Sequence, residues 1–154
     1  MKQFETSFTT QRKETISTST RRYLALAGLI IYWSLLFSST HIPRVPHVVS
    51  FYLGFDKVCH FVGYTGLAYL VSLAWTVHRP MTRPLGISNF LVVVGVLSFY
   101  GVLDEVTQPL IGRSCELADW IADVAGAAVG VSFFAAVTAL ARRIGLTALR
   151  SDAV

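Results

Sequence analysis

Four long apolar runs divide this chain of 154 residues, and they constrain its fold more than any other feature. Each run approaches the roughly 20 apolar residues that an α-helix needs to cross a bilayer. The runs lie at about Tyr23–Ser39, Val58–Val77, Ile87–Val106 and Trp120–Ala141. They are continuous and do not alternate with polar residues, which favours helices over membrane strands. We therefore expect an all-α membrane protein, a bundle of four transmembrane helices.

The composition agrees with this class. Hydrophobic residues make up 53% of the chain and charged residues 14%, whereas a soluble domain has about 25% charged residues. The net charge of +4 is spread along the sequence, so it does not indicate a nucleic-acid-binding surface. We expect a disordered polar cytoplasmic tail over residues 1–22, one transmembrane domain over residues 23–143 and a short cytoplasmic tail over residues 144–154.

The distribution of basic residues predicts the orientation in the membrane, because cytoplasmic segments carry an excess of Lys and Arg. Ten of the 13 basic residues lie in the amino-terminal tail, in the loop between the second and third runs, and after the fourth run. The other loops hold only Arg44, Lys57 and Arg113. Both termini are therefore expected in the cytoplasm.

The acidic residues are distributed in the opposite way. Six of the nine lie near the outer ends of the second, third and fourth runs, so an alternating topology brings them to one face. These six are Asp56, Asp104, Glu105, Glu116, Asp119 and Asp123. Their convergence from three separate parts of the sequence is the main functional signal in the chain.

The second run opens with three polar residues at a spacing of four. Asp56, His60 and Tyr64 share one face of a helix. Each also has an ordinary explanation, since Asp56 could cap the helix, His60 could lie at the level of the lipid head groups, and Tyr64 could be an interfacial aromatic residue. The shared face favours a common site.

The third run ends with a second set, Tyr100, Asp104 and Gln108, again four apart. Glu105 adds an adjacent carboxylate at the carboxyl end of the helix, where the macrodipole disfavours negative charge. An Asp at membrane depth costs about 2.5–3.5 kcal/mol on insertion scales. Such a pair needs either a function or a partner, and Arg113 in the following loop could supply a structural ion pair.

The fourth run begins near Asp119, which could act as its N-cap, with Asp123 one turn deeper. Gly126 and Gly130 then form a small-residue surface that allows another helix to approach closely.

Two cysteines lie at the same predicted outer face. Cys59 and Cys115 could form a disulfide there, or they could be inert thiols.

Three segments in this order, "DKVCHFVGYTGLAYL", "DEVTQPLIGRSCELADW" and "DVAGAAVG", resemble the VanZ-like family of small bacterial membrane proteins. The similarity covers about residues 42–130. Two positions depart from the family pattern. Family members commonly have Asn where this chain has Asp123, and a small polar residue where it has Glu116. The resemblance implies a multi-pass protein of the bacterial cytoplasmic (inner) membrane and a cell-envelope context. The family is named for a protein linked to resistance to teicoplanin, a glycopeptide antibiotic.

The resemblance and the spacing together select the candidate site residues. Acid–base groups for catalysis would be Asp104, Glu105 and His60. Ligand-binding residues would be Asp56, Lys57, Tyr64, Gln108, Arg113, Asp119 and Asp123.

Several functions fit these residues. One is an enzyme that modifies an envelope lipid or wall precursor, with Lys57 and Arg113 holding an anionic head group. Another is a non-catalytic accessory or structural protein, with or without self-association, whose polar groups form an ion-pair network or a partner-binding surface. No cofactor is expected, and no motif such as H-E-x-x-H indicates a metal. A divalent-metal site of Asp56, His60, Asp104 and Asp119 is an alternative.

Overall fold

The computed structural model describes residues 17–42, 54–79 and 86–144. Its regular elements there are all helical, in the order α1 (Thr18–Thr40), α2 (Phe55–His78), α3 (Ile87–Thr107), the 3-10 helix η2 (Gln108–Ile111) and α4 (Leu117–Arg143). Each of the four α-helical spans is long and apolar enough to cross a membrane. The expected all-α fold with four transmembrane helices is confirmed.

The helices extend beyond the apolar runs at most ends. Helix α1 begins at Thr18, before the expected start at Tyr23, so residues 18–22 belong to the helix and not to a tail. Most of the two expected tails, residues 1–16 and 145–154, lies outside the described residues.

The first residues of the helices differ from the expected caps. Ser17 caps α1, and its hydroxyl accepts a 3.2 Å hydrogen bond from the backbone N–H of Thr20. Gly54 and Glu116 hold the N-cap positions of α2 and α4, so the assignment of Asp56 and Asp119 as caps is wrong. Both aspartates lie inside the first helical turn, where they still favour the positive end of the helix dipole.

The turn between α3 and α4 is fixed by two residues. Pro109 occupies the first turn of η2, where it needs no backbone donor. Gly112 ends η2 with a φ of 78°, in the left-handed region that a side chain disfavours. The chain therefore reverses within a few residues and brings the end of α3 close to the start of α4.

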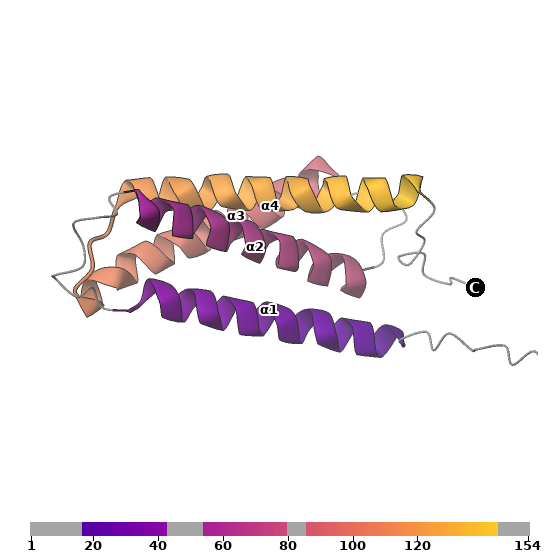
Figure 1. Ribbon diagram of the computed structural model, residues 1–154, viewed down its shortest axis with the longest axis horizontal. Coiled ribbons are helices and arrows are strands. Elements are labelled where there is room, and N and C mark those ends of the chain that lie inside the picture. Colours follow the sequence, from indigo (N-terminus) through magenta and orange to yellow (C-terminus); the bar gives the residue numbers. More distant parts are fainter. Residues whose placement is uncertain (1–16, 43–53, 80–85, 145–154) are drawn as a thin grey trace, which may run out of the picture.

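The packing order differs from the sequence order. Helix α2 packs most extensively against α4, α3 packs on α4, and α1 packs on α2 (Figure 1). The carboxyl ends of α1 and α3 lie with the amino ends of α2 and α4 at one end of the bundle, at the left in Figure 1. We call this the polar end, because it holds the acidic residues described below.

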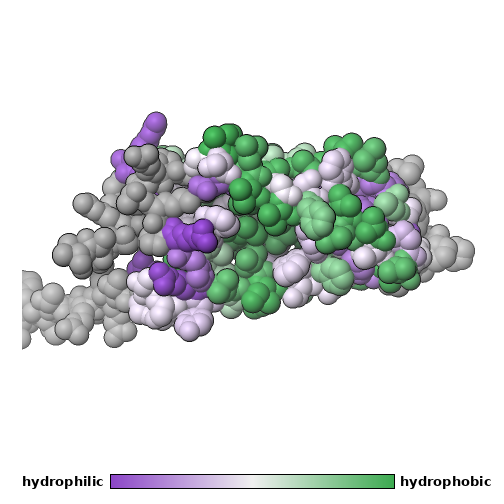
Figure 2. Space-filling view, turned by 180° about the vertical axis from the view of Figure 1, so that it is seen from behind, coloured by the Kyte–Doolittle hydropathy of each residue, from purple (hydrophilic) through white to green (hydrophobic). Residues whose placement is uncertain are grey.

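The core lies where α2, α3 and α4 meet. Its buried apolar side chains are Tyr64, Leu67, Ala68, Val93, Leu97, Ala127 and Val131. By contrast, Thr40 is the one buried residue of α1. Many large apolar side chains point outward, and Figure 2 shows them covering much of the middle of one face. This is the surface expected of a bundle surrounded by lipid.

Glycines set the distance between α2 and α4. A Cβ added at Gly126 would collide with the backbone carbonyl of Phe61, and one added at Gly130 would collide with that of Thr65. The two helices therefore approach so closely that neither glycine can carry a side chain. The prediction of a small-residue packing surface agrees with this contact.

We expect Gly126→Ala to lower the melting temperature in detergent, because the new methyl group must push α2 and α4 apart. Overpacking of this kind costs about 1–3 kcal/mol. Gly95→Ala is the matched control, since a Cβ at Gly95 meets no atom within 4 Å. Equal melting temperatures for the two variants would contradict the close contact.

Candidate functional site

A histidine and a carboxylate from facing helices form the centre of the polar end. His60 on α2 is 2% exposed and Asp123 on α4 is fully buried. Nδ1 of His60 lies 2.9 Å from Oδ1 of Asp123, and 3.9 Å from Oε1 of Glu105 on α3. The close approach of α2 and α4 at Gly126, one turn after Asp123, makes this contact possible.

Glu105 joins the end of α3 to the start of α4. Its Oε1 accepts a 2.9 Å hydrogen bond from Nε2 of Gln108. Its Oε2 accepts another of 2.9 Å from the backbone N–H of Glu116, the N-cap residue of α4. Both oxygens therefore have donors, and the side chain fixes the turn between the two helices.

Asp104 points to a different neighbour from Glu105, because consecutive residues of a helix are about 100° apart. Its Oδ1 accepts a 3.0 Å hydrogen bond from the Thr40 hydroxyl and lies 3.6 Å from Nδ1 of His41. Nε2 of His41 in turn lies 2.9 Å from the Thr107 hydroxyl. Thr40 and His41 were not among the expected site residues, although their polar side chains at the end of the first apolar run were a usable signal.

Lys57 and Arg113, basic residues described at the polar end, are paired with carboxylates. Nζ of Lys57 lies 2.9 Å from Oε2 of Glu116 and 3.1 Å from Oδ1 of Asp119. Arg113 donates a 2.9 Å hydrogen bond to Oδ1 of Asp56.

The sequence suggested an ion pair between Arg113 and the carboxylates of α3. Arg113 pairs with Asp56 instead. Arg113 follows the turn that ends α3, and its side chain reaches the first turn of α2, where it meets Asp56. Asp104 and Glu105 are instead held by uncharged donors.

All ten expected site residues thus lie at or near the polar end. Tyr64 lies one turn after His60 in α2, at the edge of the apolar core. It is fully buried, and its ring centroid lies 5.9 Å from that of Tyr100. We call the remaining nine the polar cluster: Asp56, Lys57, His60, Asp104, Glu105, Gln108, Arg113, Asp119 and Asp123.

Several buried atoms of the polar cluster have no hydrogen-bond partner among the described residues. Most are acceptors, and an unsatisfied buried group of this kind costs about 1–3 kcal/mol. They include His60 Nε2, Asp104 Oδ2, Gln108 Oε1, Asp119 Oδ2 and Asp123 Oδ2. In a purely structural network of ion pairs, buried acceptors are expected to have hydrogen-bond donors. The acceptors without donors therefore favour a site that receives a ligand.

Two groups in the cluster have the spacing of metal ligands. His60 has a possible ligand atom within 4.8 Å of those of Asp56 and Asp119, and another such group joins it to Glu105 and Asp123. Asp104, which the sequence placed among possible metal ligands, belongs to neither group because it faces Thr40.

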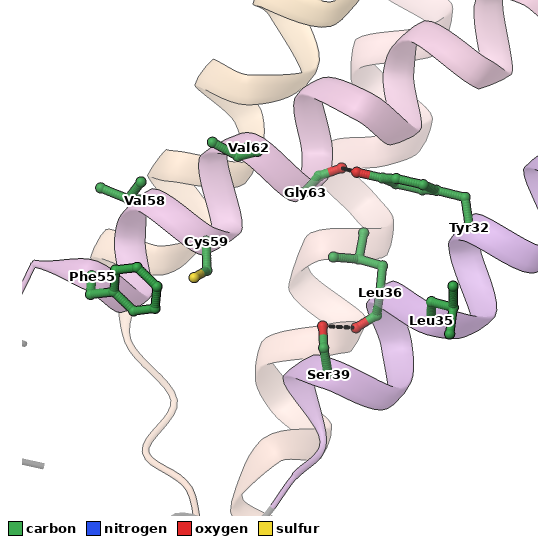
Figure 3. A pocket seen from close by; sticks show the side chains of 9 residues that line it. All are labelled: Tyr32, Leu35, Leu36, Ser39, Phe55, Val58, Cys59, Val62 and Gly63. Carbon is green, nitrogen blue, oxygen red and sulfur yellow. Dashed lines mark hydrogen bonds between the residues drawn. The ribbon is translucent and has the colours of Figure 1, made fainter. Parts of the chain in front are cut away.

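An apolar groove of about 510 Å³ opens between α1 and α2 at the same end of the bundle (Figure 3). Leu35 and Leu36 of α1 line it together with Val58, Cys59 and Val62 of α2, and Gly63 leaves space for Leu36. The groove has the lining of a binding site for a hydrocarbon chain.

A family model described as VanZ/LLP1 matches residues 3–139. The chain belongs to the VanZ/LLP1 family. The match includes the four spans almost entirely and every residue of the polar cluster. No curated protein and no solved structure shows significant similarity to the chain. The VanZ/LLP1 assignment and the four apolar helices together establish a multi-pass membrane protein.

The two cysteines of this VanZ/LLP1 protein are not joined. Cys59 and Cys115 are both free and exposed, so the suggested disulfide is absent. Cys59 lines the groove between α1 and α2, whereas Cys115 lies in the turn before α4.

We expect Asp104→Asn to melt at or above the wild-type temperature. The amide oxygen can still accept from Thr40, the amide nitrogen replaces an oxygen that has no partner, and one charge next to Glu105 disappears. Arg113→Ala should instead lose about 1–3 kcal/mol, because it removes a charged hydrogen bond to Asp56. Thermal unfolding in detergent measures both, and a large loss for Asp104→Asn would show that this carboxylate is structural.

Proposed function

We propose that this VanZ/LLP1 protein binds a lipid-linked precursor of the cell envelope at its polar end. The polar cluster would hold the head group, and the groove between α1 and α2 would hold the hydrocarbon chain. The observation that carries the proposal is the presence of buried acceptors that find no donor in the described part of the chain, at the same end of the bundle as an apolar groove.

The chemistry of the cluster describes the head group that it would recognise. Unsatisfied carboxylate and amide oxygens call for a ligand rich in donors, such as sugar hydroxyls or amino groups. Lys57 is partly exposed at the edge of the cluster, and with Arg113 it could contact a phosphate. A lipid-linked saccharide that carries phosphate has all of these groups.

Acid–base chemistry on such a ligand would centre on His60. Asp123 engages Nδ1 and fixes the ring, so Nε2 is the nitrogen left to exchange a proton. Among the described residues, no Ser, Thr or Cys side chain hydrogen-bonds His60, and the Ser114 hydroxyl donates to Glu116 instead. The arrangement therefore favours proton transfer over a covalent intermediate formed by a hydroxyl or thiol.

The proposal also specifies the side of the membrane that the polar end faces and the effect of binding there. The polar end would face the outside of the cytoplasmic membrane, as the distribution of basic residues predicts. Binding or modification of a wall precursor there would change susceptibility to teicoplanin, which acts on wall precursors.

The alternative is an accessory protein whose cluster is an ion-pair network. The pairs Lys57–Glu116 and Arg113–Asp56, which join α2 to the turn before α4, favour this function. It does not account for the acceptors that lack donors.

We expect Val62→Trp to reduce copurified lipid by about tenfold or more, the effect of losing about 1.4 kcal/mol of binding free energy. The indole would fill the groove that Val62 lines. Val96→Trp is the matched control, because Val96 is a similarly exposed valine of α3 outside the groove. Native mass spectrometry of the detergent-solubilised protein measures bound lipid, and equal lipid in both variants would refute a chain-binding groove.

The orientation can be tested with the free thiols. In a Cys59→Ser background, Cys115 at the polar end should react with a membrane-impermeant maleimide in right-side-out vesicles. Ser88→Cys, in the first turn of α3 at the opposite end and combined with Cys115→Ser, should react only after permeabilisation. The reverse pattern would place the polar end in the cytoplasm.

A further inference from the structure

We propose that Asp56, His60 and Asp119 form a binding site for one Zn²⁺ or Mn²⁺ ion. The proposal goes beyond lipid binding, and with the ion bound Nε2 of His60 is a metal ligand and does not exchange a proton. Possible ligand atoms of these three side chains lie within 4.8 Å of one another. Ligands bound to one ion at about 2.1 Å are separated by at most about 4.2 Å, so small side-chain movements would complete the site.

The hydrogen bonding of His60 selects the nitrogen that would bind the ion. Nδ1 is engaged by Oδ1 of Asp123 at 2.9 Å, whereas Nε2 is buried and has no partner among the described residues. A metal-binding histidine commonly has its other nitrogen held by a carboxylate, which fixes the ring and its tautomer. Asp123 supplies that support here.

Asp119 gives a second and independent indication. The residue is fully buried, yet neither of its oxygens accepts a hydrogen bond of good geometry from the described residues. Within the described part of the chain, its ion pair is with Lys57, whose Nζ lies 3.1 Å from Oδ1, and Oδ2 has no hydrogen-bond partner there. A buried carboxylate in this state is strongly unfavourable unless a cation or a donor approaches it.

The other group of three, His60 with Glu105 and Asp123, is a poorer metal site. Both oxygens of Glu105 already accept hydrogen bonds, from Gln108 and from the backbone of Glu116. Asp123 already binds Nδ1 of His60. These contacts form a hydrogen-bond network that orients His60. On the other side, Oδ2 of Asp119 has no hydrogen-bond partner among the described residues, which favours that side for the ion.

The charges around the site favour a divalent cation. Among the described Lys and Arg residues, Lys57 and Arg113 pair with the cluster, and they face Asp56, Glu116 and Asp119. Glu105 and Asp123 lie on the other side of His60 and add further carboxylates. One imidazole nitrogen with carboxylate oxygens is a ligand set that suits Zn²⁺ and Mn²⁺.

The ligand set can be tested by metal content and thermal stability, without lipid substrate or activity. Protein stripped with a chelator in detergent is incubated with Zn²⁺ or Mn²⁺, desalted and analysed by elemental mass spectrometry. We expect about one ion per wild-type chain, together with a higher melting temperature that a chelator reverses. Asp119→Asn and Asp56→Asn should each lower the affinity by at least about tenfold.

Asp104→Asn is the matched control, because it neutralises a buried carboxylate of the same cluster that belongs to neither ligand group. It should retain the ion. Asp56 is partly exposed, so its Asn variant provides a test if Asp119→Asn does not fold. Absence of bound ion from the wild type, or equal metal content in the wild type and the folded Asp56→Asn variant, would overturn the proposal.

Discussion

The polar end depends on the close contact between α2 and α4. Gly126 and Gly130 lie against backbone carbonyls of α2, and this contact sets the distance across which His60 reaches Asp123. Between helices in lipid, packing of this kind replaces the hydrophobic driving force that acts in water. The glycines are therefore part of the site, although they have no functional group of their own.

Burial of so many carboxylates requires compensation, and the structure supplies only part of it. Glu105 has donors on both oxygens, so its burial is offset by the turn that it holds in place. Asp104 and Asp123 each have one oxygen with a hydrogen-bond partner and one without any in the described ranges. The pairing is therefore complete at Glu105, which holds the turn, and incomplete at Asp104 and Asp123, on which the proposed ligand binding rests.

The sequence predicted the four helices and the collection of acidic residues at one end, because run length and alternating topology determine both. It could not predict the pairing of Arg113 with Asp56, which depends on how far the Gly112 turn carries the chain toward α2. It also assigned Asp119 as a cap. Helix α4 begins at Leu117, before the expected start at Trp120, so Asp119 lies inside the first turn. The polar side chain of Thr40 was visible at the end of the first run, but its contact with Asp104 depends on how α1 packs.

The weak burial of α1 gives this helix a different role from the other three. Its described polar links to the bundle are hydrogen bonds such as Tyr32 to the Gly63 carbonyl and Arg22 to the Val77 carbonyl, and little of its apolar surface is covered. In a bilayer, lipid chains compete with α1 for the face of α2. Separation of α1 from α2 therefore requires less free energy than opening the core, so the width of the groove responds to the thickness and composition of the surrounding membrane.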